Sequence, residues 1–180
     1  MVQIRESDLP TRNLLELVGA AVAAAAGTGV KVVVNDRLDI ALAVGAHGVH
    51  LGVRSVPAEA ARAAVERLAL PTPFLVGVSC HTLAQAHAAE TAGADYILLS
   101  PIFATPSKLA YGPPLGLDRL RDVTASAKVP VFALGGIGVD VVKSCLAAGA
   151  TGIAGIRVFQ ETEALAARVR ELRAQSILSL

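Results

Sequence analysis

The chain has no tryptophan, one methionine and only 3% aromatic residues, although 53% of its residues are hydrophobic. A core without large rings must be built from small aliphatic side chains, and alanine, valine, leucine and glycine are abundant here. Small residues let helices lie close on a sheet, so this composition indicates packed α/β layers. The length of 180 residues suffices to bury a substantial core, and we expect a single domain over residues 1–180.

Cysteine is also scarce. Cys80 and Cys145 lie far apart and lack metal-ligand spacing, so we expect reduced thiols in the cytoplasm. The net charge is +1, and no segment concentrates lysine or arginine, which argues against nucleic acid or a membrane surface as a partner. The alanine-rich run over residues 18–26 is too short and too weakly apolar to span a bilayer. The polar N-terminus shows no signal-peptide pattern.

Short apolar runs alternate with longer amphipathic ones along the chain. Predicted strands cover residues 1–5, 30–35, 48–51, 74–79, 96–99, 131–134 and 152–156. Predicted helices cover residues 12–26, 40–44, 58–69, 83–92, 117–125, 139–148 and 161–174. Because the strands are apolar without strict alternation, both of their faces are expected to be buried, as in a parallel sheet.

Three segments, "AVGAHGVHL", "TAGADYILL" and "AAGATGIAG", resemble one another. In each, a helix is predicted to end at Gly45, Gly93 or Gly149, where positive φ is favoured. Such a repeated unit builds either a doubly wound sheet or a (β/α)₈ barrel. Polar clusters follow every predicted strand, which favours the barrel, because its loops build one common site. Seven strands leave such a barrel one βα unit short.

Asn35 and Asp36 end the predicted strand in "VVVNDR". An amide and a carboxylate together can hold a polar heterocycle or help to coordinate a divalent metal. The same residue types also serve as helix N-caps, so both interpretations stay open.

Two further segments could bind anions. Gly135 and Gly136 let the backbone approach a phosphate closely, and a glycine-rich loop after a late barrel strand often does so. Thr105, Ser107 and Lys108 supply hydroxyl donors and a cation within one loop. The alternative for Lys108 is a solvated surface side chain.

His81 follows a predicted strand end directly. A histidine there can act as a general acid and base near neutral pH, or it can cap a helix. His50 lies inside the strand "GVHL" and is expected to face the interior or the floor of the site.

Six ordered segments carry a resemblance to a known family: "VQIRESDL", "VVVNDRLDIALAVGAHGVHLG", "GVSCHT", "GADYILLSPIFATPSK", "GPPLGLDRL" and "VFALGGIG". They resemble the thiamine phosphate synthases, a family that includes the TenI-like thiazole tautomerases. The resemblance implies a (β/α)₈ TIM barrel whose first βα unit precedes the strand in "VQIRE". It therefore implies that the chain lacks this unit.

Synthases join a pyrimidine diphosphate to a thiazole phosphate, with Mg²⁺ on the diphosphate. The resemblance assigns the pyrimidine diphosphate and its metal to Gln3, Arg5, Asn35 and Asp36, with Ser79 nearby. It assigns a loop that closes over the phosphates to Thr105, Ser107 and Lys108. Gly136 would then bind the thiazole phosphate.

Three positions depart from the synthase pattern. Ser7 stands where synthases have lysine, Ser55 replaces a metal-binding aspartate, and Arg157 replaces a phosphate-binding serine. Losing a cation and a carboxylate weakens the chemistry that ionises a diphosphate. We therefore expect a TenI-like tautomerase, which needs an anion pocket and a proton shuttle but no cofactor.

His81 is the candidate shuttle, since Pro101 stands where one type of tautomerase has histidine. The first alternative is a thiamine phosphate synthase with Mg²⁺, and the second is a non-catalytic regulatory protein on the same fold. In each case the expected ligand is a small phosphorylated thiazole. A homodimer is one way to cover an incomplete barrel.

Overall fold

The computed structural model describes residues 1–70, 72–105 and 113–177 of the chain. These residues form two compact units: unit 1 contains residues 1–79 and 91–96, and unit 2 contains residues 80–90 and 97 onward. Strands alternate with helices in both units, and the strands within each unit pair in parallel. The expected α/β class is confirmed. That residues 1–180 form a single domain stays a prediction.

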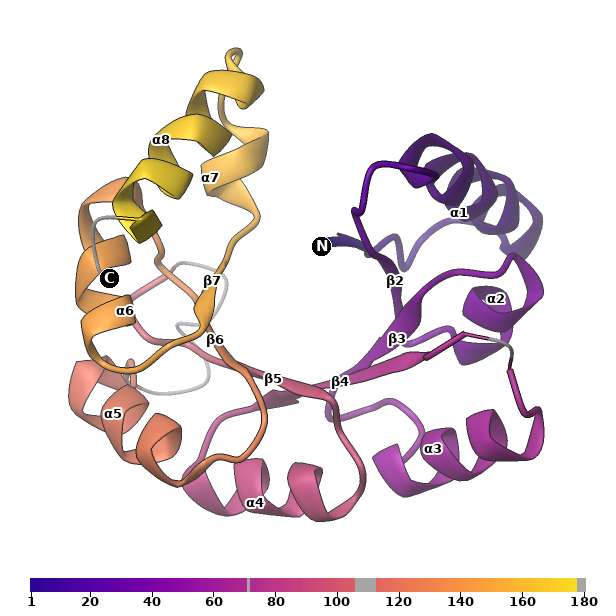
Figure 1. Cartoon of the computed structure of the whole chain (residues 1–180), viewed down its shortest axis with the longest axis horizontal. Helices are drawn as coiled ribbons and strands as arrows, with labels where there is room; N and C mark the ends of the chain where they lie inside the picture. Colours follow the sequence, from indigo (N-terminus) through magenta and orange to yellow (C-terminus); the bar gives the residue numbers. More distant parts are fainter. Residues whose placement is uncertain (71, 106–112, 178–180) are drawn as a thin grey trace. The chain divides into compact units, whose positions relative to one another are not determined.

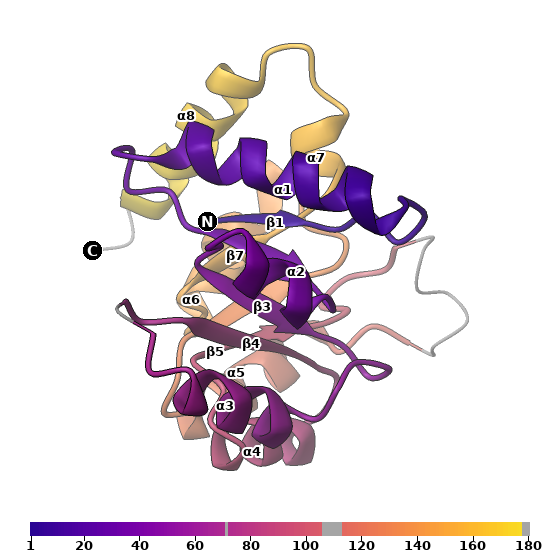
Figure 2. The same cartoon turned by 90° about the vertical axis from the view of Figure 1, so that its right-hand side faces the viewer.

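Unit 1 is a parallel ladder covered by helices on one face (Figures 1 and 2). Its strands are β1 (Val2–Ile4), β2 (Val32–Asn35), β3 (Gly48–Leu51) and β4 (Leu75–Cys80, the last residue belonging to unit 2). Its helices are α1 (Thr11–Ala25), α2 (Leu38–Ala43) and α3 (Ala58–Arg67). Neighbouring strands pair in chain order, so the carboxyl ends of β1 and β2 lie side by side.

The core of unit 1 lies between this ladder and its helices. It is built from the aliphatic and aromatic side chains of Leu14, Val18, Val34, Ile40, Ala41, Ala46, Val49, Leu51, Ala61, Val65, Phe74 and Val76. All four residues of β3 are buried, as are the first three of β2. The unbroken apolar runs of these two strands predict their burial, because both faces of a strand inside a parallel sheet are usually covered.

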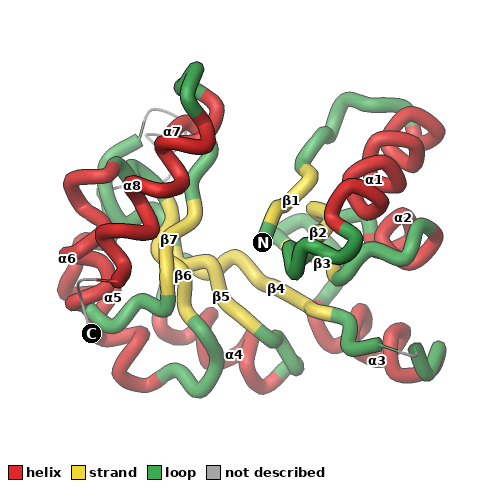
Figure 3. The backbone as a smooth tube through the Cα atoms, turned by 45° about the horizontal axis from the view of Figure 1, so that its top comes forward, coloured by secondary structure: helices red, strands yellow, loops and turns green. Residues whose placement is uncertain are grey.

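Unit 2 repeats the same arrangement (Figure 3). Its strands are β5 (Tyr96–Leu99, the first residue belonging to unit 1), β6 (Val131–Leu134) and β7 (Gly152–Ala154). Its helical segments are α4 (Leu83–Thr91, the last residue in unit 1), α5 (Gly116–Ser126), the 3₁₀ turn η2 (Val139–Val141), α6 (Val142–Ala147), α7 (Arg157–Gln160) and α8 (Leu165–Ile177). α5 and α6 lie on one face of the strands, and α8 packs against α6 and α7.

The structure corrects one local expectation. The helix predicted over residues 161–174 corresponds to α8, which begins only at Leu165, because the Thr162 hydroxyl accepts the N–H of Ala164 and forms a turn just before it. The Ser55 hydroxyl accepts the N–H of Gly52 at 2.8 Å, and α3 begins without a side-chain cap. The positive φ expected at Gly45, Gly93 and Gly149 is confirmed. Among the described residues, none of the helices has the length and apolarity that crossing a membrane requires.

Candidate functional site

The polar side chains at the carboxyl ends of β1 and β2 contact each other in unit 1. The Gln3 side-chain amide donates to Oδ1 of Asn35 at 3.3 Å, across two strands that pair directly. Arg5, two residues beyond Gln3, is exposed. No hydrogen bond or ion pair of the Arg5 side chain is found within the described ranges. This end of the ladder therefore presents an oriented amide pair and a cation.

Asp36 adopts a strained backbone conformation next to Asn35. Its φ is +66°, and the N–H of Arg37 donates to the carbonyl of Asn35 at 2.8 Å, which closes a three-residue turn around Asp36. A tight turn with positive φ is rare for a residue other than glycine, and such strain concentrates at functional sites. α2 begins at Leu38 without a side-chain cap, so the N-cap interpretation of Asn35 and Asp36 is wrong.

Ser79 belongs to a buried chain of hydrogen bonds that the sequence did not reveal. His50 Nε2 lies 2.8 Å from Oγ of Ser79, and Nδ1 lies 3.2 Å from the Tyr96 hydroxyl. The His50 side chain is buried, and this burial lowers its pKa to about 4. Burial also raises the pKa of Tyr96, with a smaller contribution from the Asp95 carboxylate. At neutral pH the imidazole is therefore uncharged and acts as a fixed bridge between two hydroxyls.

The described residues offer few carboxylates as ligands for a metal ion. No group of three or more His, Cys, Asp or Glu side chains in the described ranges is arranged as a metal site. Mg²⁺ needs only one or two protein carboxylates when substrate phosphates supply the other oxygens. Asp36 offers one exposed carboxylate, so the donor set suits a metal ion that arrives with a diphosphate.

The imidazole ring of His81, in unit 2, forms a hydrogen bond with the backbone and does not cap a helix. Its Nδ1 lies 2.5 Å from the carbonyl oxygen of Ser100, so this nitrogen carries the proton and donates it. The cap of α4 comes from Thr82, whose hydroxyl accepts the N–H of Gln85 at 3.1 Å. The capping interpretation of His81 is therefore wrong. When the ring is neutral, Nε2 keeps a lone pair that can accept a proton.

The Gly135–Gly136 pair packs on the loop that follows β5, within unit 2. Both glycines have positive φ. A Cβ on Gly135 would meet Pro101, and one on Gly136 would approach the carbonyl oxygen of Ala104 to 2.7 Å. The carbonyl of Gly135 accepts the N–H of Phe103 at 3.0 Å. These contacts alone require glycine at both positions.

Thr105, the last described residue of that loop, is buried and accepts a hydrogen bond from Nη2 of Arg157 at 3.3 Å. In the sequence, Arg157 stands out only as a departure from the family pattern. Ser107 and Lys108 lie outside the described residues. The two cysteine thiols are buried and free, and burial raises the pKa of each to about 11. They stay protonated and unreactive near neutral pH.

The chain is similar to a known protein family and to several of its members. The sequence profile of the family described as "Thiamine monophosphate synthase" matches residues 1–159. A "Thiamine-phosphate synthase" of Moorella thermoacetica is 43% identical over 172 residues, covering 96% of this chain and 80% of the relative. The protein of the same name from Methanoculleus marisnigri is 41% identical over 173 residues, covering 96% and 80%.

Among solved structures, "Thiamine phosphate pyrophosphorylase from Pyrococcus furiosus" aligns with a TM-score of 0.89 and 32% identity. The alignment covers 99% of this chain and 83% of that structure. The resemblance found in the sequence is therefore confirmed, and so is the α/β fold class of the thiamine phosphate synthase type.

Proposed function

Since this chain belongs to the thiamine monophosphate synthase family, we propose that it is a transferase that makes thiamine phosphate. It would join a pyrimidine diphosphate to a thiazole phosphate and release diphosphate. The observation that carries the proposal is the 43% identity, over 96% of the chain, with a relative named thiamine-phosphate synthase. The comparisons thus favour the first alternative of the sequence analysis over the tautomerase that it preferred.

The polar residues of unit 1 suit the diphosphate substrate. In this proposal Arg5 donates to diphosphate oxygens, and the Gln3 amide, held by Asn35, binds the substrate in one orientation. Ser79 offers a hydroxyl whose direction is fixed by His50. The diphosphate leaves a carbon of the pyrimidine substrate, so donors aimed at the departing oxygens stabilise the charge that develops on them.

Asp36 would hold Mg²⁺ together with oxygens of the diphosphate. Bound there, the ion would supply positive charge against the leaving group. The strained turn at Asp36 supports this role, because it fixes the carboxylate immediately beyond β2. Ser55 offers no carboxylate, so the protein contributes one anionic ligand rather than two.

The loops of unit 2 suit a phosphate monoester. Gly135 and Gly136 keep the backbone after β6 bare of side chains, and Thr105 places a hydroxyl on the neighbouring loop. We extend the proposal to Ser107 and Lys108, which would add a hydroxyl and a cation to the same anion. The thiazole phosphate is the ligand assigned to these loops.

The test is formation of thiamine phosphate by the purified protein from pyrimidine diphosphate, thiazole phosphate and Mg²⁺. Product that depends on both substrates and disappears with a chelator supports the proposal. Asp36→Asn is the informative variant, because it keeps the shape of the side chain and removes its charge. Absence of product at saturating substrates would refute the synthase, and tight thiazole phosphate binding without turnover would point to a regulatory protein.

One observation favours the tautomerase as a second candidate. One ring nitrogen of His81, Nδ1, donates to the Ser100 carbonyl, so Nε2 is the atom through which a proton would be exchanged with a substrate. If this is the activity, the protein accelerates aromatisation of the thiazole carboxylate phosphate without metal, and His81→Gln abolishes it. An unchanged rate relative to the uncatalysed reaction would exclude this candidate.

A further inference from the structure

We propose that Tyr96 and His50 are positioning residues that turn the hydroxyl proton of Ser79 toward the diphosphate of the pyrimidine substrate. The Tyr96 hydroxyl donates to Nδ1 of His50, Nε2–H of His50 donates to Oγ of Ser79, and the proton of Ser79 is left for a substrate oxygen. The inference rests on the proposed synthase function, to which it adds the direction of each hydrogen bond and a role for Tyr96. All three residues belong to unit 1.

The register of β3 and β4, together with one glycine, brings these side chains together. His50 lies opposite Gly77, and Ser79 lies two residues further along β4, so its side chain is on the same face of the ladder as position 77. Gly77 has no side chain, and a Cβ there would overlap the ring of Tyr96. The Tyr96 ring therefore occupies the space beside His50, against which it stacks with ring centroids 5.7 Å apart.

Each nitrogen of the His50 ring has a hydroxyl partner. Nδ1 lies 3.2 Å from the Tyr96 hydroxyl, and Nε2 lies 2.8 Å from Oγ of Ser79. Burial lowers the pKa of His50 to about 4 and raises the pKa of Tyr96, so near neutral pH the imidazole is uncharged and the phenol keeps its proton. A neutral imidazole has one N–H and one bare nitrogen. The hydrogen bonds can thus run only from Tyr96 to Ser79 or from Ser79 to Tyr96.

The charge of the substrate selects between these two directions. His50 and Tyr96 are 2% and 4% exposed, whereas Ser79 is only half-buried, so Ser79 is the member that a ligand can reach. In the described part of the chain, the Ser79 side chain forms no hydrogen bond other than the one with His50. A diphosphate oxygen is negative and accepts hydrogen bonds. The direction from Tyr96 to Ser79 presents a donor to this oxygen, whereas the reverse direction presents a lone pair that repels it.

The hydrogen bonds lead to the end of unit 1 that carries the other residues proposed to bind the diphosphate. β2 pairs with β3 so that Asn35 is opposite His50, and the N–H of Asp36 donates to the carbonyl of His50 at 2.8 Å. The Gln3 amide contacts Asn35 at 3.3 Å. The Ser79 proton is therefore offered beside the amide pair and the carboxylate assigned to Mg²⁺.

Nuclear magnetic resonance of the imidazole nitrogens tests the direction without turnover. The chain has four histidines, and the signals that disappear in His50→Gln identify those of His50 in protein labelled with ¹⁵N-histidine. Near neutral pH we expect the proton on Nε2 and a bare Nδ1, both in the free protein and with pyrimidine diphosphate and Mg²⁺ bound. In Tyr96→Phe, the Nδ1 signal should shift toward that of a nitrogen without a hydrogen bond.

A double-mutant cycle tests whether Tyr96 acts through Ser79. Calorimetry with pyrimidine diphosphate and Mg²⁺, without the thiazole substrate, measures binding alone. We expect Ser79→Ala to weaken binding about ten- to a hundredfold and Tyr96→Phe about three- to tenfold. In the Ser79→Ala background, Tyr96→Phe should weaken binding no further, because the hydroxyl that it orients is gone. Affinity for the pyrimidine alcohol, which lacks the diphosphate, should stay constant in both variants.

A core variant controls for lost stability. Val65→Ala, in the buried core of unit 1, removes apolar contacts and touches none of the three hydrogen-bonded side chains. It should lower the free energy of unfolding and leave the affinity for pyrimidine diphosphate unchanged. The KM for thiazole phosphate should also be unchanged in Tyr96→Phe, which separates orientation of one donor from a general disturbance of the protein.

Three results would overturn the inference. They are a protonated Nδ1 with a bare Nε2, an equal effect of Tyr96→Phe with and without the Ser79 hydroxyl, and a parent protein that does not bind pyrimidine diphosphate. If the parent makes no thiamine phosphate but binds pyrimidine diphosphate through Ser79, with Nε2 of His50 protonated, the synthase proposal fails while this inference holds. The two proposals therefore fail by different measurements.

Discussion

The imidazole of His50 bridges two hydroxyls, with Nε2 2.8 Å from Ser79 Oγ and Nδ1 3.2 Å from the Tyr96 hydroxyl. The rings of His50 and Tyr96 also stack, with centroids 5.7 Å apart. Of the three residues joined by these hydrogen bonds, Ser79 is the one to which the proposed function assigns a role. The Ser79 hydroxyl is therefore oriented by the buried imidazole of His50.

This bridge predicts a pH dependence of stability. The pKa of His50 is about 4 in the folded protein, against about 6.5 for an unfolded chain. Below pH 6.5 the unfolded state takes up a proton that native His50 does not, so the free energy of unfolding falls as pH drops toward 4. The loss reaches about 3 kcal/mol at most. Urea unfolding at several pH values measures it.

His50→Gln should flatten this part of the pH profile, whereas His87→Gln, at an exposed histidine of α4, should leave it unchanged. Parallel profiles for the parent and His50→Gln would contradict the assignment. The NMR signal of the native His50 ring gives a second test, because it should not titrate between pH 7 and 5.

Any side chain at position 77 is expected to clash with one neighbour, Tyr96. A Cβ at this buried position would overlap the Tyr96 ring. Gly77→Ala should therefore lower the free energy of unfolding by about 1–3 kcal/mol, as overpacked cores do. The same substitution should cost clearly less in a Tyr96→Leu background, because the ring is gone. Equal costs in both backgrounds, measured by urea unfolding, would show that the conflict lies elsewhere.

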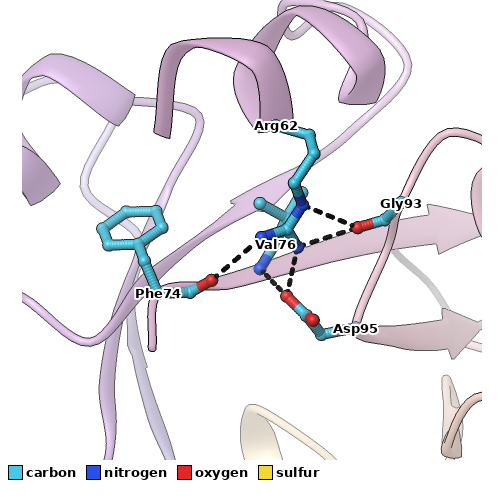
Figure 4. A network of polar contacts seen from close by, with 5 residues as sticks. All are labelled: Arg62, Phe74, Val76, Gly93 and Asp95. Carbon is cyan, nitrogen blue, oxygen red and sulfur yellow. Dashed lines mark hydrogen bonds and ion pairs between the residues drawn. The ribbon is translucent and has the colours of Figure 1, made fainter. Parts of the chain in front are cut away.

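The Arg62–Asp95 network is predicted to serve stability without serving activity (Figure 4). The Asp95 carboxylate accepts from the Arg62 guanidinium at 2.5 Å and from the N–H of Val76 at 2.7 Å, and Arg62 also donates to the carbonyl of Gly93. These contacts lie at the amino ends of β4 and β5, whereas the proposed substrate residues follow strand carboxyl ends.

Asp95→Ala should lower the free energy of unfolding by about 1–3 kcal/mol, since it leaves the N–H of Val76 without its acceptor and the Arg62 guanidinium without its counter-charge. The partial exposure of both side chains keeps the loss below that of a fully buried pair. The kcat/KM measured well below the melting temperature should stay unchanged, and Arg119→Ala on the surface of α5 is the control. A large loss of activity with unchanged stability would reverse the interpretation.

For Asp36 we expect the opposite result, a loss of activity without a loss of stability. Asp36→Gly relieves a positive φ that costs a side chain about 1–2 kcal/mol, so stability should be equal or slightly higher. Activity should fall about a hundredfold or more, because the charge that would hold Mg²⁺ is lost. Asp36→Asn should lose activity similarly with little change in stability. If both variants stay active at low Mg²⁺, Asp36 is not the metal ligand.

Much of the fold could be predicted because its signals are local. The apolar runs of β3, β5 and β6 predicted their observed bounds exactly as residues 48–51, 96–99 and 131–134. Gly45 marked a helix end, because only glycine adopts positive φ there without strain. The short helix α7 was missed, because four residues are too few to show a helical period.

The candidate site was less accessible from sequence, since its contacts join distant residues. The bridge from His50 to Ser79 depends on the parallel register that sets His50 opposite Gly77, and no local pattern states that register. The contact of Thr105 with Arg157 likewise spans separate loops. Ser7 and Ser55 led the sequence analysis toward a tautomerase. However, one carboxylate plus substrate oxygens can still hold Mg²⁺, so those two residues could not decide the reaction.

The crowding around Gly135 and Gly136 bears on how such chains are recognised in genomes. Any descendant that keeps the loop after β5 must keep both glycines, whether or not it still meets a phosphate. The two glycines are thus required by the packing of the fold, and their presence does not indicate which reaction a protein catalyses. A survey that sorts paralogues by chemistry would do better to compare what stands at positions 36 and 157.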